Sequence, residues 1–223
     1  MDISVIMPCL NEERSLGDCI DQVKEVIKKQ NYHAEIIVVD NGSKDKSKQI
    51  AIEKEVRLIE EPKKGYGNAY ISGINHANGK IIIMGDCDGT YDFNEIPNFI
   101  ENLKINDFVI GNRFYDIQNG AMPFLHRYIG NPILRLMLRV YGLKINEVCT
   151  GFIGIKKPVL ENLNLKEPGM EFSSEFLVKI AKNRLKIKEL PITYYKRKGK
   201  SKLRTFHDGL RHFWFLFREL FKN

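Results

Sequence analysis

Short apolar runs alternate with longer amphipathic stretches along the amino-terminal half of the chain. Runs this short and this rich in Ile and Val predict buried parallel strands at residues 3–7, 36–39, 56–59 and 81–84. Between them, residues 12–29 carry apolar side chains at the spacing of one helical face, and helices are also expected over 44–54 and after the glycine-rich turn 63–68. The alternation predicts an α/β fold in which helices flank both faces of a mostly parallel central sheet in a single domain.

Two acids follow the fourth predicted strand directly, in the segment Gly85-Asp86-Cys87-Asp88. In open α/β sheets, ligands bind beyond the carboxyl ends of the strands. Two carboxylates separated by one residue can converge there on a hard divalent cation that keeps open positions for substrate phosphates. The alternative interpretation is an Asp-rich turn, in which Asp88-Gly89 supplies the turn chemistry and Asp92 caps a helix that starts near Asn94.

Polar residues also follow the other predicted strands. We expect Pro8 to end strand pairing and Asn11 to cap the first helix. Asp40 is a carboxylate suited to hydrogen bonds from a nucleobase or a ribose, although a turn explains it equally well. Near the next strand end, Lys64 supplies positive charge and the amide of Gly65 can approach a diphosphate, as can those of its neighbours.

Composition narrows the class of protein without naming it. The chain has 223 residues, of which 43% are hydrophobic and 28% charged, so it can bury a full core. Its net charge of +7 favours an anionic partner, either nucleic acid, a phosphorylated small molecule or a membrane surface. We find no motif that reads RNA or DNA, so nucleic acid is not expected.

Cysteine usage and hydropathy bear on the location of the protein. Neither a zinc ribbon nor a disulfide framework is indicated by the spacing of Cys9, Cys19, Cys87 and Cys149. We see no basic-then-apolar leader and no apolar run near the ~20 residues that span a bilayer. We therefore expect a cytoplasmic protein that is soluble or lies peripherally on a membrane surface.

The carboxyl-terminal residues 205–223 predict an amphipathic helix that follows a catalytic domain of residues 1–204. Its apolar stripe is bordered by Arg204, Arg211 and Arg218 and consists of Phe206, Leu210, Phe213, Phe217 and Leu220, widened by Trp214 and Phe221. Such a helix either lies in a membrane interface or packs on the sheet. The similarly apolar stretch 124–141, which Pro132 should end or kink, is a second candidate for contact with a lipid chain.

Several motifs in this order and spacing resemble the family 2 glycosyltransferases, which have the GT-A fold. They are Pro8 to Glu12, Val38 to Ser43, Gly65 to Ala69 and the Asp-x-Asp motif Asp86-Cys87-Asp88. Within that family the chain looks most like the polyprenol-phosphate sugar synthases, the dolichol-phosphate mannose and glucose synthase group. Further matching segments are 111–114, 120–123 with Arg127, 169–172 with Glu175, and 200–204.

The resemblance implies a donor site and a metal. It implies that the nucleotide is held by Pro8, Leu10, Glu12 and Asp40, and that Asp86 and Asp88 hold Mg²⁺ or Mn²⁺ against the donor diphosphate. The family usually has a second acid where this chain has Asn41. The implied reaction moves a hexose from a UDP- or GDP-sugar to a polyprenyl phosphate at the cytoplasmic face of a membrane, with attachment that is peripheral or through a membrane-embedded protein partner.

A lipid phosphate is already ionised, so it needs cations to hold it rather than a strong general base. Guanidinium groups and lysines provide such cations, and we expect Arg113, Arg127 and Lys202 to act here together with Asp88, with Lys200 and Arg204 as further candidates. The alternative acceptor is a sugar hydroxyl in polysaccharide or cell-envelope glycan assembly. That reaction requires a base, for which Glu171 and Glu175 are the candidates.

Overall fold

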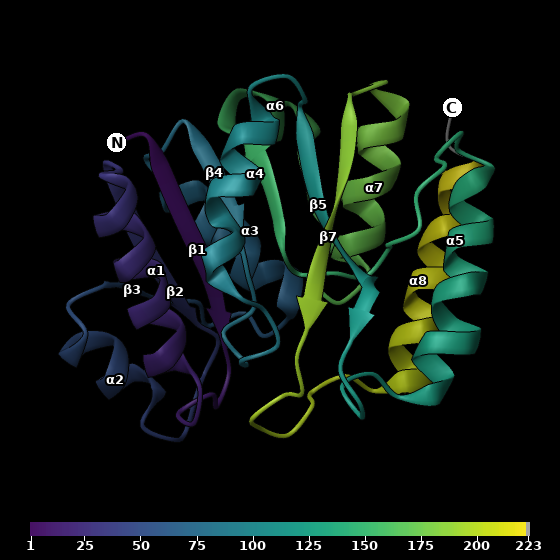
Figure 1. Ribbon diagram of the computed structural model, residues 1–223. Helices are drawn as coiled ribbons and strands as arrows, with labels where there is room; N and C mark the ends of the chain where they lie inside the picture. The colour runs from purple at the N-terminus through teal and green to yellow at the C-terminus, as the bar shows by residue number, and fades with distance from the viewer. Residues whose placement is uncertain (222–223) are drawn as a thin grey trace.

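The predicted strands form the core of a twisted sheet in the computed structural model, which describes residues 1–221 (Figure 1). Each amino-terminal strand lies within three residues of its predicted start and end, because local runs of Ile and Val define it. The strands are β1 (Ile3–Cys9), β2 (Ala34–Asp40), β3 (Arg57–Glu60), β4 (Ile81–Met84), β5 (Phe108–Ile117), β6 (Ile153–Lys156) and β7 (Ile187–Tyr194).

The strand order is β3-β2-β1-β4-β6-β5-β7. Only β6 runs antiparallel to its two neighbours, while the other pairs in this sheet are parallel. The prediction of a mostly parallel sheet is therefore confirmed. As a result, every strand except β6 ends at the same edge of the sheet, the lower edge in Figure 1.

The expectation that Pro8 ends strand pairing is wrong. Pro8 lies opposite Val39 of β2, and β1 continues to Cys9. On its other side β1 pairs with β4 only as far as Ile6, opposite Met84. The missing N–H of Pro8 therefore falls beyond the end of β4, where the ladder needs no donor.

The first helix also begins later than predicted. Asn11 does not cap it: Asn11 has a φ of 55°, and its side-chain oxygen accepts the N–H of Lys44 at 2.7 Å. The helix begins at Leu16, with Ser15 in the N-cap position. Asn11 thus joins two neighbouring loops at the lower edge of the sheet.

Helices cover both faces of the sheet, as predicted. The core on one face contains side chains of α1, α2 and α4, and the core on the other contains side chains of α3, α5, α6, α7 and α8. The short segments η1 (Phe93–Glu95) and η2 (His126–Gly130, a π-helical turn) precede α4 and α5. The helices are α1 (Leu16–Gln30), α2 (Ser47–Glu53), α3 (Tyr66–His76), α4 (Ile96–Leu103), α5 (Asn131–Arg139), α6 (Lys157–Leu163), α7 (Phe172–Lys182) and α8 (Thr205–Leu220).

Helix α8 packs with the face opposite to its apolar stripe. Its buried residues are Asp208, His212, Phe215 and Leu216, and its packing partners include α5 and α7. His212 accepts or donates a 2.7 Å hydrogen bond with Ser174 of α7. The interpretation that the stripe packs α8 on the sheet is therefore wrong. Residues 222–223 of the predicted helix lie outside the described residues.

The stripe of α8 instead faces away from the core, beside a second outward-facing apolar row on η2 and α5. Figure 1 shows α5 and α8 side by side at one end of the sheet. We call this surface the apolar face; its large exposed side chains are Phe124, Leu125, Tyr128, Ile129, Ile133, Leu136, Val140, Phe206, Leu210, Phe213, Trp214, Phe217, Leu220 and Phe221. Pro132 does not break this row, because it lies in the first turn of α5, where a missing N–H is tolerated.

The helices within residues 1–221 include none that is both long and apolar enough to cross a membrane.

Candidate functional site

Carboxylates from several strand ends gather at the lower edge of the sheet. Glu12 follows β1, Asp40 ends β2, and Asp86 and Asp88 follow β4. Glu12, Asp40 and Asp88 are buried, and Asp86 is partly buried. Buried carboxylates require partners, so the groups that surround them define the chemistry of this edge.

Asp86 is enclosed by two tyrosines of α3. The hydroxyls of Tyr66 and Tyr70 donate to its Oδ1 at 3.0 and 3.1 Å. Burial and the neighbouring charge of Asp88 raise the pKa of Asp86 to about 7. Gly151 lies against the other side of the Asp86 carboxylate. A Cβ added to Gly151 would lie only 2.3 Å from Asp86 Oδ2. Such a carboxylate gains from a nearby cation, which would favour its ionised form.

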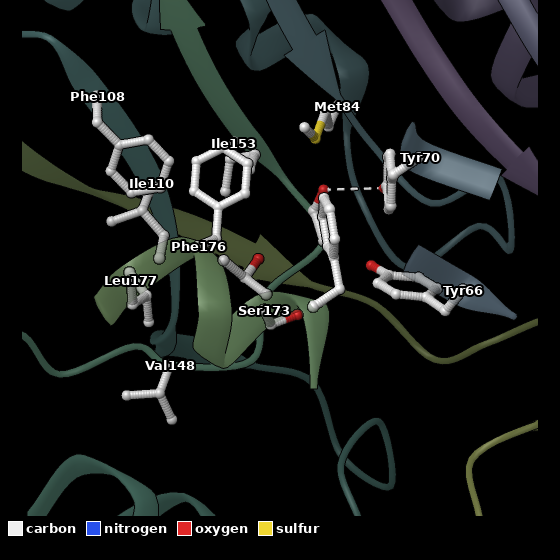
Figure 2. A pocket seen from close by; sticks show the side chains of 13 residues that line it. Tyr66, Tyr70, Met84, Phe108, Ile110, Val148, Ile153, Ser173, Phe176 and Leu177 are labelled. Carbon is white, nitrogen blue, oxygen red and sulfur yellow. Dashed lines mark hydrogen bonds between the residues drawn. The ribbon is translucent and has the colours of Figure 1, made fainter. Parts of the chain in front are cut away.

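A small apolar cavity lies directly behind these tyrosines. Figure 2 shows Tyr66 and Tyr70 at one side of it, with Met84 of β4 nearby and Phe176 and Leu177 of α7 opposite. The side chains behind the tyrosines are thus mostly apolar, which agrees with burial as the main cause of the raised pKa of Asp86.

Asp88 is held by Thr90 and by Arg197, a residue that the motifs did not point to. Its Oδ1 accepts from the backbone N–H and the hydroxyl of Thr90, at 3.0 and 2.5 Å. Its Oδ2 accepts from Arg197 at 2.6 Å. Arg197 belongs to residues 195–204 between β7 and α8, which we call the strap; it passes below the lower edge of the sheet in Figure 1.

Glu12 binds the same strap. Its Oε1 accepts from Arg197 Nη2 and from Lys202 Nζ, the latter at 2.7 Å. Lys202 also donates to the carbonyl of Asn11 at 3.0 Å. Burial raises the pKa of Glu12, although both cations favour its charged form. The structure thus brings Lys202 together with Glu12 and Asp88, and it adds Arg197, whose only signal in the sequence was membership of a basic run.

The turn interpretation holds for Asp92 and in part for Asp88. Asp92 accepts the N–H of Asn94 at 3.0 Å and so caps η1, as predicted. Asp88 makes turn bonds with Thr90 but also binds Arg197, and Asp86 makes no bond of this local kind.

The carboxylates fit a cation that is shared with a ligand. Among the described residues, no group of three or more His, Cys, Asp or Glu side chains is arranged to hold a metal alone. Mg²⁺ typically uses one or two protein carboxylates and takes its remaining ligands from water and substrate phosphates. Asp86 and Asp88 supply that number of carboxylates, so their chemistry suits an ion bound together with a diphosphate.

The glycine-rich turn before α3 has a different role from the one predicted. The N–H of Gly65 donates to Asn41 Oδ1 at 2.8 Å, and the N–H of Asn68 donates to the carbonyl of Pro168 at 3.1 Å. A Cβ on Gly65 would lie 2.1 Å from that carbonyl oxygen. Glycine is therefore needed for close backbone packing, and the Gly65 amide is not open to a diphosphate.

Asp40 and Lys64 remain beside this turn. Asp40 accepts the N–H groups of Gly42 and Ser43 at 3.0 and 3.2 Å and lies 3.6 Å from Lys48 Nζ. Lys64 is exposed, and its side chain lies near Gly42. Pro8 and Leu10 are partly buried at the end of β1. All of these residues lie at the same edge as the Asp86 and Asp88 carboxylates.

Comparison with known proteins identifies the family. Residues 4–163, more than half of the chain, match the sequence profile described as Glycosyl transferase family 2. The chain belongs to glycosyltransferase family 2. This confirms the family predicted from the motifs.

Curated relatives agree with this assignment. The chain is 38% identical over 218 residues to the low-salt glycan biosynthesis hexosyltransferase Agl6 of Haloferax volcanii, covering 96% of this chain and 52% of that protein. It is 30% identical to a dolichyl-phosphate hexose transferase of the same organism (93% and 89% covered). It is also 30% identical to the dolichol-phosphate mannosyltransferase of Pyrococcus furiosus (98% and 64% covered). The chain thus spans about half the length of the first of these relatives.

Solved structures share the fold. Glucosyl-3-phosphoglycerate synthase from Mycobacterium tuberculosis, solved in complex with Mn²⁺, uridine diphosphate and phosphoglyceric acid, superposes with a TM-score of 0.80 at 19% identity, covering all of this chain and 79% of that one. The same enzyme with phosphoglyceric acid alone gives 0.79. The predicted GT-A fold of this family 2 glycosyltransferase is confirmed.

A second charged cluster lies where β5 leaves the sheet. Glu147, which is fully buried, accepts from Arg113 Nε and Nη2, both at 2.8 Å, and from the N–H groups of Val148 and Cys149. The Arg113 guanidinium also lies 5.0 Å from the centre of the Tyr194 ring. Burial opposes its charge, but Glu147 outweighs burial and holds the pKa of Arg113 well above its usual value. Glu147 was missed because no local pattern marks it.

Arg127 lies on η2, at the border of the apolar face. Its side chain is exposed and stacks over Tyr128, with 5.3 Å between guanidinium and ring centre. The adjacent His126 bonds to the hydroxyl of Thr205 at 2.9 Å, which ties η2 to the start of α8. Burial and the charge of Arg113 lower the pKa of His126. Arg113 and η2 therefore lie close together, with Arg127 on the outer side.

The two candidate bases both have polar partners, although Glu171 Oε2 has none. Glu175 accepts the N–H groups of Lys166 and Glu167, at 2.8 and 2.7 Å, and pairs with Lys179 at 2.7 Å. Glu171 pairs with Arg211 of α8 and accepts the N–H of Gly169 at 3.3 Å. Both carboxylates thus hold the loop before α7 and the helix α8 in place.

We predict that Glu147→Gln destabilises the protein by about 3–5 kcal/mol, because it leaves the buried charge of Arg113 without its partner. Urea unfolding of both forms measures the difference. Glu101→Gln is the matched control: Glu101 pairs with Lys104 on the surface, and its loss should change stability by under about 1 kcal/mol. Equal effects of the two substitutions would contradict the importance given to the Arg113–Glu147 pair.

Proposed function

We propose that this chain transfers a hexose from a nucleotide-diphosphate sugar to a polyprenyl phosphate, with Mg²⁺ or Mn²⁺ as cofactor. The observation that carries the proposal is the gathering of Glu12, Asp86 and Asp88 at one edge of the sheet beside two cations. The names of two relatives, a dolichyl-phosphate hexose transferase and a dolichol-phosphate mannosyltransferase, support the acceptor class.

The donor side follows from the strand ends. Pro8, Leu10, Glu12 and Asp40 surround the nucleoside in this proposal, and Lys64 adds positive charge near its phosphates. Gly65 contributes only through its bond to Asn41, which fixes the turn that carries Lys64. Asp86 and Asp88 hold the divalent cation, which when bound neutralises negative charge that develops on the leaving nucleoside diphosphate.

The acceptor side uses cations rather than a base. Arg113 is buried and oriented by its two bonds to Glu147, and Arg127 is exposed nearby. Lys202 lies beside the donor carboxylates, through its bonds to Glu12 and to the carbonyl of Asn11. The alternative sugar-hydroxyl acceptor needs a free carboxylate as base. Both oxygens of Glu175 are engaged with other groups, which favours the phosphate acceptor. Glu171 pairs with Arg211 through Oε1 and keeps Oε2 without a partner, so it is the candidate base that remains for the alternative.

We further propose that the chain acts peripherally at the cytoplasmic face of a membrane, through the apolar face. Phe206 is 79% exposed, Val140 69% and Trp214 63%, a combination typical of helices that lie in a lipid interface. Arginines border this face, among them Arg127, Arg135, Arg139, Arg204 and Arg218. They would pair with anionic headgroups. The cysteines at positions 9, 19, 87 and 149 are free thiols, which agrees with a reducing compartment.

The first experiment measures sugar transfer from UDP-glucose, UDP-N-acetylglucosamine and GDP-mannose to undecaprenyl phosphate in the presence of Mn²⁺. With the donor that the unsubstituted protein accepts, we expect Asp88→Asn to lower kcat by about 10²-fold or more, because the substitution removes a charge that holds the cation. Asp92→Asn is the control, since Asn caps a helix as well as Asp does. Normal turnover by Asp88→Asn, with an unchanged melting temperature, would contradict the role of Asp88 in holding the cation.

The second experiment measures sedimentation of the protein with vesicles that contain phosphatidylglycerol. Trp214→Ser combined with Phe217→Ser should weaken binding at least tenfold, since two interfacial anchors are lost. Ile52→Ser combined with Ile105→Ser is the control, because both isoleucines are exposed elsewhere on the molecule. If the unsubstituted chain stays in the supernatant, the peripheral mode is refuted and attachment requires a membrane-embedded partner.

A further inference from the structure

Arg197 bridges carboxylates from two different strand ends. It donates to Asp88 Oδ2 at 2.6 Å and to Glu12 Oε1. The strap that carries it is fastened to the same loops: the N–H of Tyr195 donates to the carbonyl of Thr90 at 3.0 Å, and the N–H of Lys198 donates to that of Asp88 at 3.1 Å. The guanidinium therefore lies at the centre of the proposed donor site.

Arg197 binds the oxygen of Asp88 that remains open to a metal ion. A carboxylate oxygen has two lone pairs, and both lone pairs of Oδ1 are taken by the N–H and the hydroxyl of Thr90. Oδ2 is the remaining oxygen, and Arg197 takes one of its two lone pairs. A divalent cation on the second lone pair would repel a guanidinium this close, so the two cations compete for Asp88.

The observed arrangement leaves two buried polar atoms without a partner. These atoms are Arg197 Nε and Glu12 Oε2. Buried polar groups are usually satisfied, so their presence beside one ion pair points to a second arrangement in which Arg197 finds other acceptors. A diphosphate offers them, since a guanidinium donates two parallel hydrogen bonds to phosphate oxygens.

We propose that Arg197 is an exchangeable internal cation: it neutralises Asp88 and Glu12 in the free protein, leaves Asp88 when a divalent cation binds with a nucleoside diphosphate, and then binds the diphosphate oxygens. The inference rests on the proposed function, because it takes the carboxylate edge as the donor site. In this proposal the strap couples metal binding to nucleotide binding. Metal alone binds weakly, since it must displace Arg197 without offering that side chain a new partner.

The test measures Mn²⁺ binding by the loss of the free-ion EPR signal, without any acceptor or turnover. Arg197→Gln and Arg197→Met remove the competing charge, so each should bind Mn²⁺ alone about tenfold more tightly than the unsubstituted protein. Both should bind UDP or GDP at saturating Mn²⁺ about tenfold more weakly, because the diphosphate loses its guanidinium. Arg197→Lys retains the charge and should leave Mn²⁺ binding weak.

Lys198→Ala is the matched control. Lys198 is the next residue of the strap, but its side chain pairs with Asp18 at 2.6 Å and does not contact Asp88. It should leave both affinities unchanged, and melting temperatures verify that each variant is folded. If the unsubstituted chain binds Mn²⁺ and nucleotide but the uncharged variants bind Mn²⁺ no more tightly, the exchange is refuted while the donor site stands. If the unsubstituted chain binds neither, both proposals fail.

Discussion

Negative charge concentrated at one edge of a parallel sheet is the constraint on which this structure depends. The topology brings Glu12, Asp86 and Asp88 together because the strands that precede them run in the same direction. Carboxylates in such a partly buried place repel one another and lose hydration. Arg197 and Lys202 of the strap neutralise this charge, and together with the backbone hydrogen bonds of Tyr195 and Lys198 they hold the loop between β7 and α8 against the edge.

The same strap connects the carboxylate edge to the opposite end of the molecule. It leads directly into α8, whose start is tied to η2 by the bond between His126 and Thr205. Arg127 therefore lies between a charged edge suited to a sugar nucleotide and an apolar face suited to lipid. The proposed acceptor, a phosphorylated lipid, would match both surfaces, with its charge at the edge and its chain along the face.

The sequence was sufficient for features that depend on neighbouring residues. The strands, the Asp86–Asp88 pair and the Asp92 cap follow from local patterns. Contacts between distant residues were not predictable: Arg197 and Asp88 are 109 positions apart, and Glu147 and Arg113 are 34 apart. Gly65 was misread for the same reason, because the backbone that packs against it belongs to Pro168. The stripe of α8 was recognised, but its outward direction depends on the buried polar pair of Ser174 and His212.

The most direct test of the account is a crystal structure of the protein with Mn²⁺ and UDP or GDP, in which anomalous scattering locates the metal. The account predicts one strong peak in contact with Asp88 and with both phosphates of the nucleotide. A nucleotide bound at another place, or a carboxylate edge that stays without manganese at saturating concentration, would contradict it.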